Sequence, residues 1–378
     1  MGPQPNRYLP LFASKDRGLL YPVNSRAIAV RQGETVDIVC TGRDNTLVGL
    51  RQASVTATCQ RQGSLDVAAN FVFNCTKKIS DVVSETGESC GSRGNSKIIQ
   101  IGWDLPGQGF SRQVEVCFNS RNLSTAYSRH IVKGSGMRYR DRNVSWLPRP
   151  QFKLDSFFSH LSPSMSTVYT NQNETMAALL GSSKIAKAYI GGWGSESYLA
   201  RGHLSPDGDF ILQTWQDATY HYINAVPQWQ AFNNGNWKDL EGFIRTKSTT
   251  PTPRDLVIYT GTHGVLRLPD INNNLVSIFL LHGQNQEGVP VPEYMWKVVV
   301  DNQSNEAVAF VLLNHPSNTD RPIAEPPLLC PDVCDRITWV PWRDRNNKNK
   351  GKIYCCTVAS LRRKIPAIPN HPNVKLME

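Results

Sequence analysis

Residues 198–245 read YLARGHLSPDGDFILQTWQDATYHYINAVPQWQAFNNGNWKDLEGFIR, and they hold three polar motifs. The motifs are RGH at 201–203, NAVPQ at 224–228 and NNGNWKDLE at 233–241. Histidine, amide and carboxylate side chains gathered in this way are the materials of a hydrolytic or metal-binding site. This stretch is therefore the strongest candidate for a functional site in the chain.

The third motif lies in a segment with helical periodicity. Trp237, Leu240 and Ile244 fall at positions i, i+3 and i+7, which places three apolar side chains on one face of a helix. Glu241 and Arg245 are four residues apart on that helix. Taken by themselves, these two residues predict an exposed surface ion pair.

Two of the polar residues also have an ordinary structural interpretation. Asn233 stands where this helix is expected to start, and asparagine is among the best N-capping residues. His203 follows a glycine in an extended stretch, and a lone histidine is more often structural than catalytic. The residues alone leave a histidine, an amide and the Glu241 carboxylate without a chemical link.

The order and spacing of the motifs resemble the DNA/RNA non-specific endonucleases of the ββα-metal (His-Me finger) superfamily. Their signature is Asp-Arg-Gly-His, then Asn-x-x-Pro-Gln, then Asn-x-x-x-Trp-x-x-Leu-Glu. The chain matches every position except the leading aspartate, which is Ala200 here. This chain most resembles one subgroup, the secreted arthropod nucleases, such as crustacean duplex-specific nucleases and insect gut double-stranded-RNA nucleases. The resemblance to that subgroup covers nearly the whole chain.

The resemblance implies a catalytic role for His203 and a metal-binding role for Asn233. His203 would be the general base that takes a proton from water, and an imidazole with a reference pKa of about 6.5 suits this near neutral pH. Asn233 would be the one direct protein ligand of Mg2+, with Mn2+ as an alternative ion, because Mg2+ keeps most of its waters. Glu241 would bind the metal through water.

Four further residues complete the catalytic set that the resemblance implies. Asn224 and Gln228 would support the histidine and the metal shell. Arg201 and Arg245 are candidates for phosphate contact, because guanidinium groups match phosphate oxygens. Attack in line with the leaving oxygen would give 5′-phosphate ends.

One basic residue of the family pattern is missing. The best-known members carry a phosphate-binding arginine some distance before the histidine, and this chain has no arginine between Arg149 and Arg201. Lys184, Lys187 or a residue from the basic flanks would have to replace it.

The net charge of +10 is unevenly distributed along the chain. Residues 1–150 carry a net charge of +9, residues 151–320 carry −5 and residues 321–378 carry +6. Basic flanks favour a polyanionic partner such as DNA or RNA. The expected nucleic-acid contacts are Arg138, Arg140, Arg142, Arg343, Arg345, Lys348, Lys350 and Lys352.

Nine cysteines form two groups that predict local disulfides. The groups are Cys40, Cys59, Cys75, Cys90 and Cys117, and Cys330, Cys334, Cys355 and Cys356. A zinc site is the alternative for the second group, but adjacent cysteines fit four-ligand zinc spacing poorly, so two disulfides are favoured there. The odd count in the first group leaves one thiol over.

Several features indicate export. N-glycosylation acceptors occur at Asn74, Asn122, Asn143, Asn173 and Asn302, and disulfides belong to oxidising compartments. The first five residues have no apolar core, so we expect a processed or incomplete form of a secreted protein. No apolar run is long enough to span a membrane, and no obligate protein partner is evident.

Patterning along the chain predicts an α+β protein with two parts. Short runs with period-two alternation predict that residues 1–145 form a small disulfide-stapled all-β domain, which would add nucleic-acid contacts. Residues 146–378 would form the ββα-metal nuclease core with a stapled C-terminal tail. A helix is expected over residues 174–187.

The sequence thus predicts a secreted, Mg2+-dependent, sequence-non-specific endonuclease that hydrolyses DNA and RNA. The alternative is a catalytically weak secreted nucleic-acid-binding protein on the same fold. The presence of His203, Asn233 and Glu241 together favours the enzyme.

Overall fold

The structure is a computed structural model that describes residues 8–23, 28–61, 64–68, 71–92, 94–140, 149–192, 195–283, 286–316 and 323–378. Arg142 and the acceptor Asn143 lie outside the described residues.

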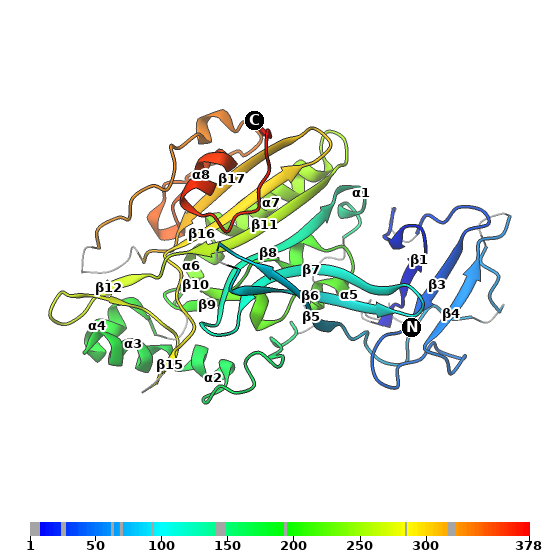
Figure 1. Cartoon of the computed structure of the whole chain (residues 1–378), viewed down its shortest axis with the longest axis horizontal. Coiled ribbons are helices and arrows are strands. Elements are labelled where there is room, and N and C mark those ends of the chain that lie inside the picture. Colours follow the sequence, from blue (N-terminus) through cyan, green and yellow to red (C-terminus); the bar gives the residue numbers. More distant parts are fainter. Residues whose placement is uncertain are drawn as a thin grey trace.

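A nine-stranded sheet forms the centre of the molecule (Figure 1). Its order is β18-β17-β16-β11-β8-β7-β6-β5, all antiparallel, and a short strand β19 pairs in parallel with β17. The strands are β5 (Val82–Cys90), β6 (Ser96–Leu105), β7 (Gly109–Asn119), β8 (Ser124–Lys133), β11 (Asp255–His263), β16 (Tyr294–Asp301), β17 (Glu306–Leu313), β18 (Ile353–Cys356) and β19 (Lys375–Leu376).

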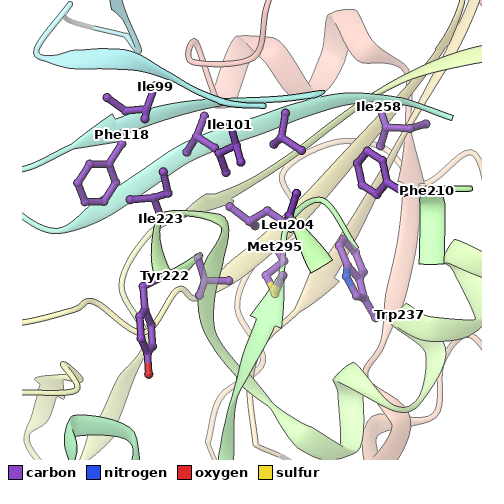
Figure 2. Close-up of a cluster of buried hydrophobic side chains, with 14 of the residues drawn as sticks. Ile99, Ile101, Phe118, Leu204, Phe210, Tyr222, Ile223, Trp237, Ile258 and Met295 are labelled. Atoms are coloured by element: carbon purple, nitrogen blue, oxygen red, sulfur yellow. The ribbon is translucent and has the colours of Figure 1, made fainter. Parts of the chain in front are cut away.

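Both faces of the central sheet are covered by apolar layers. Val299 and its alternating neighbours pack into the larger core, together with Leu204, Ile223 and Trp237 from the segment of the three motifs (Figure 2). Val298 points to the other face, where it joins a second cluster that includes residues of the C-terminal helix. A strand buried on both faces needs apolar residues at every position, which is why β16 and β17 are almost continuously hydrophobic.

A second, smaller sheet lies at one end of the molecule (Figure 1). Its order is β2-β1-β3-β4, and the Cys40–Cys75 disulfide links the end of β3 to the loop after β4. The strands are β1 (Leu11–Ser14), β2 (Gly18–Leu19), β3 (Thr35–Val39) and β4 (Ser54–Thr58).

The central sheet runs across the domain boundary that we expected at residue 145. Strand β8 pairs with β11 from Tyr127 opposite Gly261 to Lys133 opposite Asp255. The four strands between residues 82 and 133 therefore belong to the same sheet as β11, β16 and β17, and the separate all-β sheet ends at Thr58. Alternation of apolar residues predicts a strand but not its partner, so this pairing was not visible in the sequence.

Helices and short strands fill the spaces around the two sheets. The helices are α1 (Gly134–Met137), α2 (Met165–Thr170), α3 (Gln172–Leu180), α4 (Ser183–Tyr189), α5 (Gln213–Asp217), α6 (Gln230–Asn233), α7 (Asn236–Thr249) and α8 (Val358–Lys364). The 3-10 turns are η2 (Asp207–Asp209), η3 (Tyr222–Asn224), η4 (Cys334–Arg336) and η5 (Lys348–Lys350). The remaining strands are β9 (Leu199–His203), β10 (Ala225–Trp229), β12 (Arg267–Pro269), β13 (Leu275–Ser277), β14 (His282–Gly283) and β15 (Gln286–Glu287).

The helix expected over residues 174–187 is two helices, α3 and α4. Gly181 ends α3 with a φ of 68°, a left-handed conformation that glycine adopts without strain. Ser182 then caps α4 by accepting a hydrogen bond from the backbone N–H of Ile185. Gly181 therefore ends the first helix, and Ser182 begins the second.

Four disulfides staple the chain, as the two cysteine groups predicted. They are Cys40–Cys75, Cys90–Cys117, Cys330–Cys356 and Cys334–Cys355. Cys59 is the remaining thiol, and it is buried. The adjacent Cys355 and Cys356 pair with two different partners. In the parts of the chain that the structure describes, no helix is long and apolar enough to cross a membrane.

Candidate active site

The three motifs form a hairpin followed by a helix. Strands β9 and β10 pair antiparallel, with His203 opposite Ala225 and Ala200 opposite Gln228. Helices α6 and α7 follow directly after β10. The hairpin carries Leu204 and Ile223, which anchor it in the larger core against the central sheet (Figure 2). This is a ββα unit, and it holds all six residues of the expected catalytic set and the expected metal ligand.

His203 stands at the end of β9 with its ring enclosed by aromatic side chains. The ring centroids of Tyr220 and Phe152 lie 4.7 Å and 4.9 Å from that of His203. Its Nε2 is buried and has no hydrogen-bond partner among the described residues. Burial lowers the pKa of His203 to about 4, against the opposing effect of Asp207 and with a further lowering by the Arg149 cation. The imidazole is therefore neutral near pH 7, and it can accept a proton.

Asn224 fixes the turn that follows His203. Its Oδ1 accepts hydrogen bonds from the Ser205 backbone N–H at 3.0 Å and the Ser128 hydroxyl at 3.1 Å. Its Nδ2 donates to the carbonyls of Ser205 and Thr219, both at 2.9 Å. The side chain is fully buried and all its bonds go to protein groups, so Asn224 holds the turn at Ser205 in place.

Arg245 pairs with Asp209, which differs from the ion pair with Glu241 that the helical spacing suggested. Its Nη1 donates to Asp209 Oδ1 at 2.8 Å, and the other oxygen of Asp209 bonds to His130 Nε2 at 2.9 Å. Although burial opposes it, these bonds hold the pKa of Asp209 far below its usual range. Spacing along a helix reveals neighbours on that helix, but Asp209 reaches the arginine from η2.

The amide of Gln228 and the amide oxygen of Asn233 have no hydrogen-bond partner among the described residues. Gln228 is fully buried, yet neither atom of its amide has a hydrogen-bond partner in the described part of the chain. It lies so close to Gly202 that a Cβ added there would come within 2.4 Å of Gln228 Oε1, which explains the glycine of the first motif. Asn233 donates from Nδ2 to Gln230 Oε1 at 3.3 Å, and its Oδ1 accepts no bond from the described residues.

Asn233 is not the N-cap that its position suggested. It is the last residue of α6, and Gly235 immediately precedes α7. The amide is therefore not needed for capping and is available for another ligand.

Glu241 lies half-buried on α7. Burial raises the pKa of its carboxyl to about 7; the Lys297 ammonium opposes this rise, and the Asp209 carboxylate adds to it. Lys297 itself is fully buried on β16, where its Nζ donates to Thr260 Oγ1 at 2.7 Å. A carboxyl whose pKa is raised in this way, with the Lys297 ammonium compensating its charge only in part, is a candidate functional group.

Arg201 is held among aromatic rings. Its guanidinium lies 4.8 Å from the ring centroid of Tyr169, 5.6 Å from that of Tyr222 and 6.0 Å from that of Phe152. Its Nε also donates to the Tyr222 hydroxyl at 3.1 Å. These contacts fix the cation beside the ring that touches His203.

Two arginines from the N-terminal flank reach the site. Arg149 is exposed and lies close enough to His203 and Asp207 to lower the pKa of both. Arg140 donates to the Gly208 carbonyl at 3.1 Å, next to the guanidinium of Arg245. Arg149 belongs to the basic flanks that were expected to supply a phosphate contact, but no local spacing connects it to the histidine.

The basic residues expected to bind nucleic acid fall into two classes. Arg345 pairs with Asp332 at 2.6 Å, and Lys348 and Lys352 both pair with Glu325. Arg343 and Lys350 are exposed and have no ion pair with a described residue. Arg138, also exposed, donates to the Thr249 carbonyl at 2.9 Å.

The backbone of Lys350 packs against Gly235, at the junction of α6 and α7. A Cβ on Gly235 would fall 3.0 Å from the Lys350 Cα. The buried Asn236 side chain donates to the carbonyls of Asp344 at 3.0 Å and Gly351 at 2.7 Å. The stapled C-terminal tail is thereby fastened to the junction of α6 and α7.

The sequence matches a family of known proteins. The family model of the DNA/RNA non-specific endonucleases matches residues 94–361. A salivary endonuclease of Lutzomyia longipalpis is 30% identical over 324 residues, which cover 85% of this chain and 70% of that protein. A salivary endonuclease of Culex quinquefasciatus is 25% identical, over 96% of this chain and 87% of that protein.

Among solved structures, a crystal structure of the EndoG/EndoGI complex is similar to this chain, with a TM-score of 0.37 and 20% sequence identity. The match covers 56% of this chain and 75% of the chain in that structure. The family assignment depends on the sequence matches, which include the whole ββα unit and most of the central sheet. This chain belongs to the DNA/RNA non-specific endonuclease family.

Proposed function

We propose that this protein is a secreted, divalent-metal-dependent endonuclease that hydrolyses the phosphodiester bonds of DNA and RNA without sequence specificity. The observation that carries the proposal is the buried Nε2 of His203, which lacks a partner in the described chain. It lies in the same ββα unit as the unused Oδ1 of Asn233 and the Glu241 carboxyl, whose pKa is raised. The lowered pKa of His203 favours its neutral form. The endonuclease activity itself is the common property of the family.

The residues present fit a hard divalent cation such as Mg2+, with Mn2+ as an alternative. Asn233 Oδ1 would be the direct ligand, Glu241 would hold water on the ion, and the orphaned amide of Gln228 would bond to that water. Amide and carboxylate oxygens are the donors that such ions prefer. When bound, the ion would neutralise phosphate charge and stabilise the leaving oxygen.

His203 would take the proton from the attacking water. Its surroundings favour the neutral imidazole, and Asn224 holds the turn that aims it. Attack in line with the 3′ oxygen would leave a 5′-phosphate, which end-group labelling of the products can test.

Arg149 is our candidate for the family's missing phosphate-binding arginine. It is exposed, and its charge acts on both His203 and Asp207. Arg140 and Arg245 meet at Gly208 beside the same turn, and Arg201 is fixed behind Phe152. Lys184 and Lys187, on α4, have no contact with the described residues that supports this role.

Arg343 and Lys350, with the exposed Arg138, would extend the contact along the backbone of the substrate. Arg345, Lys348 and Lys352 already face carboxylates, so we expect less from them. Lys350 adjoins α6, on which Asn233 lies, and would reach the same strand of nucleic acid. The N-terminal sheet would add backbone contacts.

A nuclease assay on plasmid DNA and RNA in Mg2+, with and without a chelator, tests the proposal. Chelator-sensitive digestion of both substrates is expected, and His203→Ala should slow it by on the order of a hundred- to ten-thousand-fold. Tight nucleic-acid retention without digestion would instead favour the alternative, a catalytically weak secreted binding protein. Secretion is supported by the four disulfides and the N-glycosylation acceptors, and glycosidase treatment of the secreted protein would test it.

A further inference from the structure

His221 is a buried histidine between two carboxylates, and the proposed reaction does not use it. Its Nε2 lies 2.6 Å from Asp81 Oδ2, and its Nδ1 lies 2.9 Å from Asp155 Oδ2. The exposed fractions of the three side chains are 2%, 5% and 12%, respectively. When both ring nitrogens bond to acceptors, both must donate, and only the imidazolium can do so.

His221 bonds to residues from two other parts of the chain. Asp81 immediately precedes β5, and Asp155 ends the segment 149–155, which we call the strap. The strap is laid against residues 220–222: the Lys153 N–H donates to the Tyr220 carbonyl at 2.9 Å, and the Tyr222 N–H donates to the Lys153 carbonyl at 3.1 Å. One side chain therefore fastens the strap to the hairpin and to the central sheet.

The strap forms one wall of the candidate active site. Its Phe152 ring contacts His203 and Tyr220, and its Arg149 acts electrostatically on the same histidine. A shift of the strap would change the burial of the proposed base and the position of the nearest exposed arginine together.

The charges that face His221 balance one another. Asp81 and Asp155 face its two nitrogens, and Lys153 forms a second ion pair with Asp81. The two carboxylates raise the pKa of His221 above its ordinary value, against the effect of burial. Loss of the proton would leave two buried carboxylates with a single cation, Lys153.

We propose that His221 is a positioning residue: its imidazolium clasps the strap to the hairpin, so that Phe152 and Arg149 stay against His203, and loss of its proton at alkaline pH releases them. The inference rests on the proposed function, since it assumes that His203 does the chemistry. It predicts that kcat declines at alkaline pH because His221 loses its proton.

The test compares kcat–pH profiles and strap mobility in His221→Gln, Asp155→Asn and the double variant. Asp155→Asn should move the alkaline limb of kcat to lower pH by roughly one to three pH units, because it removes a charge that favours the protonated ring. His221→Gln should abolish that limb and lower the kcat plateau, up to roughly a hundredfold, as misplaced groups do. The double variant should recover part of the loss, since its charges balance again.

Hydrogen exchange of the Lys153 and Tyr222 amides provides a measurement that is independent of activity. Both amides should exchange faster in His221→Gln than in the wild type. In the wild type, their exchange should also accelerate above the pH of the alkaline limb by more than the ordinary base catalysis of hydrogen exchange explains. His160→Gln, an exposed histidine after the strap, is the matched control and should change neither readout.

An alkaline limb that stays in place in Asp155→Asn and His221→Gln would overturn the proposal, as would unchanged exchange of the two amides. A protein with faster exchange in His221→Gln but no nuclease activity in the wild type would instead refute the proposed function while leaving the clasp intact.

Discussion

Arg245 donates a hydrogen bond to the buried carboxylate of Asp209 at 2.8 Å, although Glu241 lies one turn before it on the same helix. The other oxygen of that carboxylate bonds to His130, whose Nδ1 lies 2.8 Å from Ser205 Oγ. Arg245 therefore belongs to a buried network that ends two residues after His203. We therefore expect Arg245 mainly to stabilise the turn that follows His203, in addition to any contact with phosphate.

Arg245→Met should destabilise the fold. The substitution keeps the apolar stem but leaves the buried Asp209 without its cation, and we expect the free energy of unfolding at pH 7 to fall by about 3 kcal/mol. Denaturant titration measures this. Arg336→Met is the control, because its partner Glu378 is exposed and the pair should contribute less than about 1 kcal/mol. Equal losses in both variants would contradict the network.

Acidification should remove the contribution of Asp209. Its pKa in the folded protein is depressed, so its stabilisation is present above the unfolded value of about 3.9 and is lost as the pH falls below it. The difference in unfolding free energy between wild type and Asp209→Asn should accordingly shrink below about pH 4. A difference that stays constant from pH 7 to pH 2 would show that the carboxylate charge does not matter.

His203→Ala should lower the rate of cleavage by on the order of a hundred- to ten-thousand-fold, because it removes the general base. Binding of a non-cleavable oligonucleotide should survive. In the wild type, the lowered pKa of about 4 keeps the imidazole neutral, so the limb of kcat/KM that belongs to His203 should lie well below its ordinary value of 6.5. An acid limb near 6.5 that disappears in His203→Ala would show that the pKa of His203 is not lowered.

Asn233→Ala should weaken the response to metal. Removing the unused Oδ1 takes away the proposed direct ligand, so the Mg2+ concentration for half-maximal activity should rise strongly. Asn234→Ala is a close control: the neighbouring amide is exposed and donates to Glu196 at 2.9 Å. Identical Mg2+ titrations for Asn233→Ala and the wild type would remove Asn233 from the metal site.

Lys350→Ala should weaken substrate binding in a salt-dependent way. A lysine that contacts one phosphate contributes about one unit to the slope of log K against log salt, and its loss should flatten the slope by about that much. Lys352→Ala, whose ammonium already pairs with Glu325, should change the slope less. Equal slopes for both variants and the wild type would show that these C-terminal basic residues do not contact the substrate and contribute only to solubility.

Much of the site was predictable because its parts are local in sequence. Trp237, Leu240 and Ile244 form the buried face of α7, as their spacing indicated, and the RGH and NAVPQ motifs pair as neighbouring strands. The cysteine groups predicted local disulfides, though not their pairing, because each pair closes a short loop within its own segment.

The rest depends on contacts between distant segments, which no local pattern encodes. Arg149 reaches His203 because the strap pairs with residues 220–222, and Asp209 reaches Arg245 from a turn outside the helix. The N-capping role given to Asn233 was wrong because a short helix, α6, precedes α7. Pairing of β8 with β11 likewise joins two segments more than a hundred residues apart.

The pairing of β8 with β11 also limits how the protein can be divided. A fragment that began at residue 146 would contain the hairpin, α7 and every residue of the proposed catalytic set, but it would leave β11 as an unpaired edge between Asp255 and Gly261. Long exposed strand edges that are apolar recruit other chains. We expect such a fragment to aggregate. The strands between residues 82 and 133 carry none of the proposed catalytic residues, but the nuclease fold requires them.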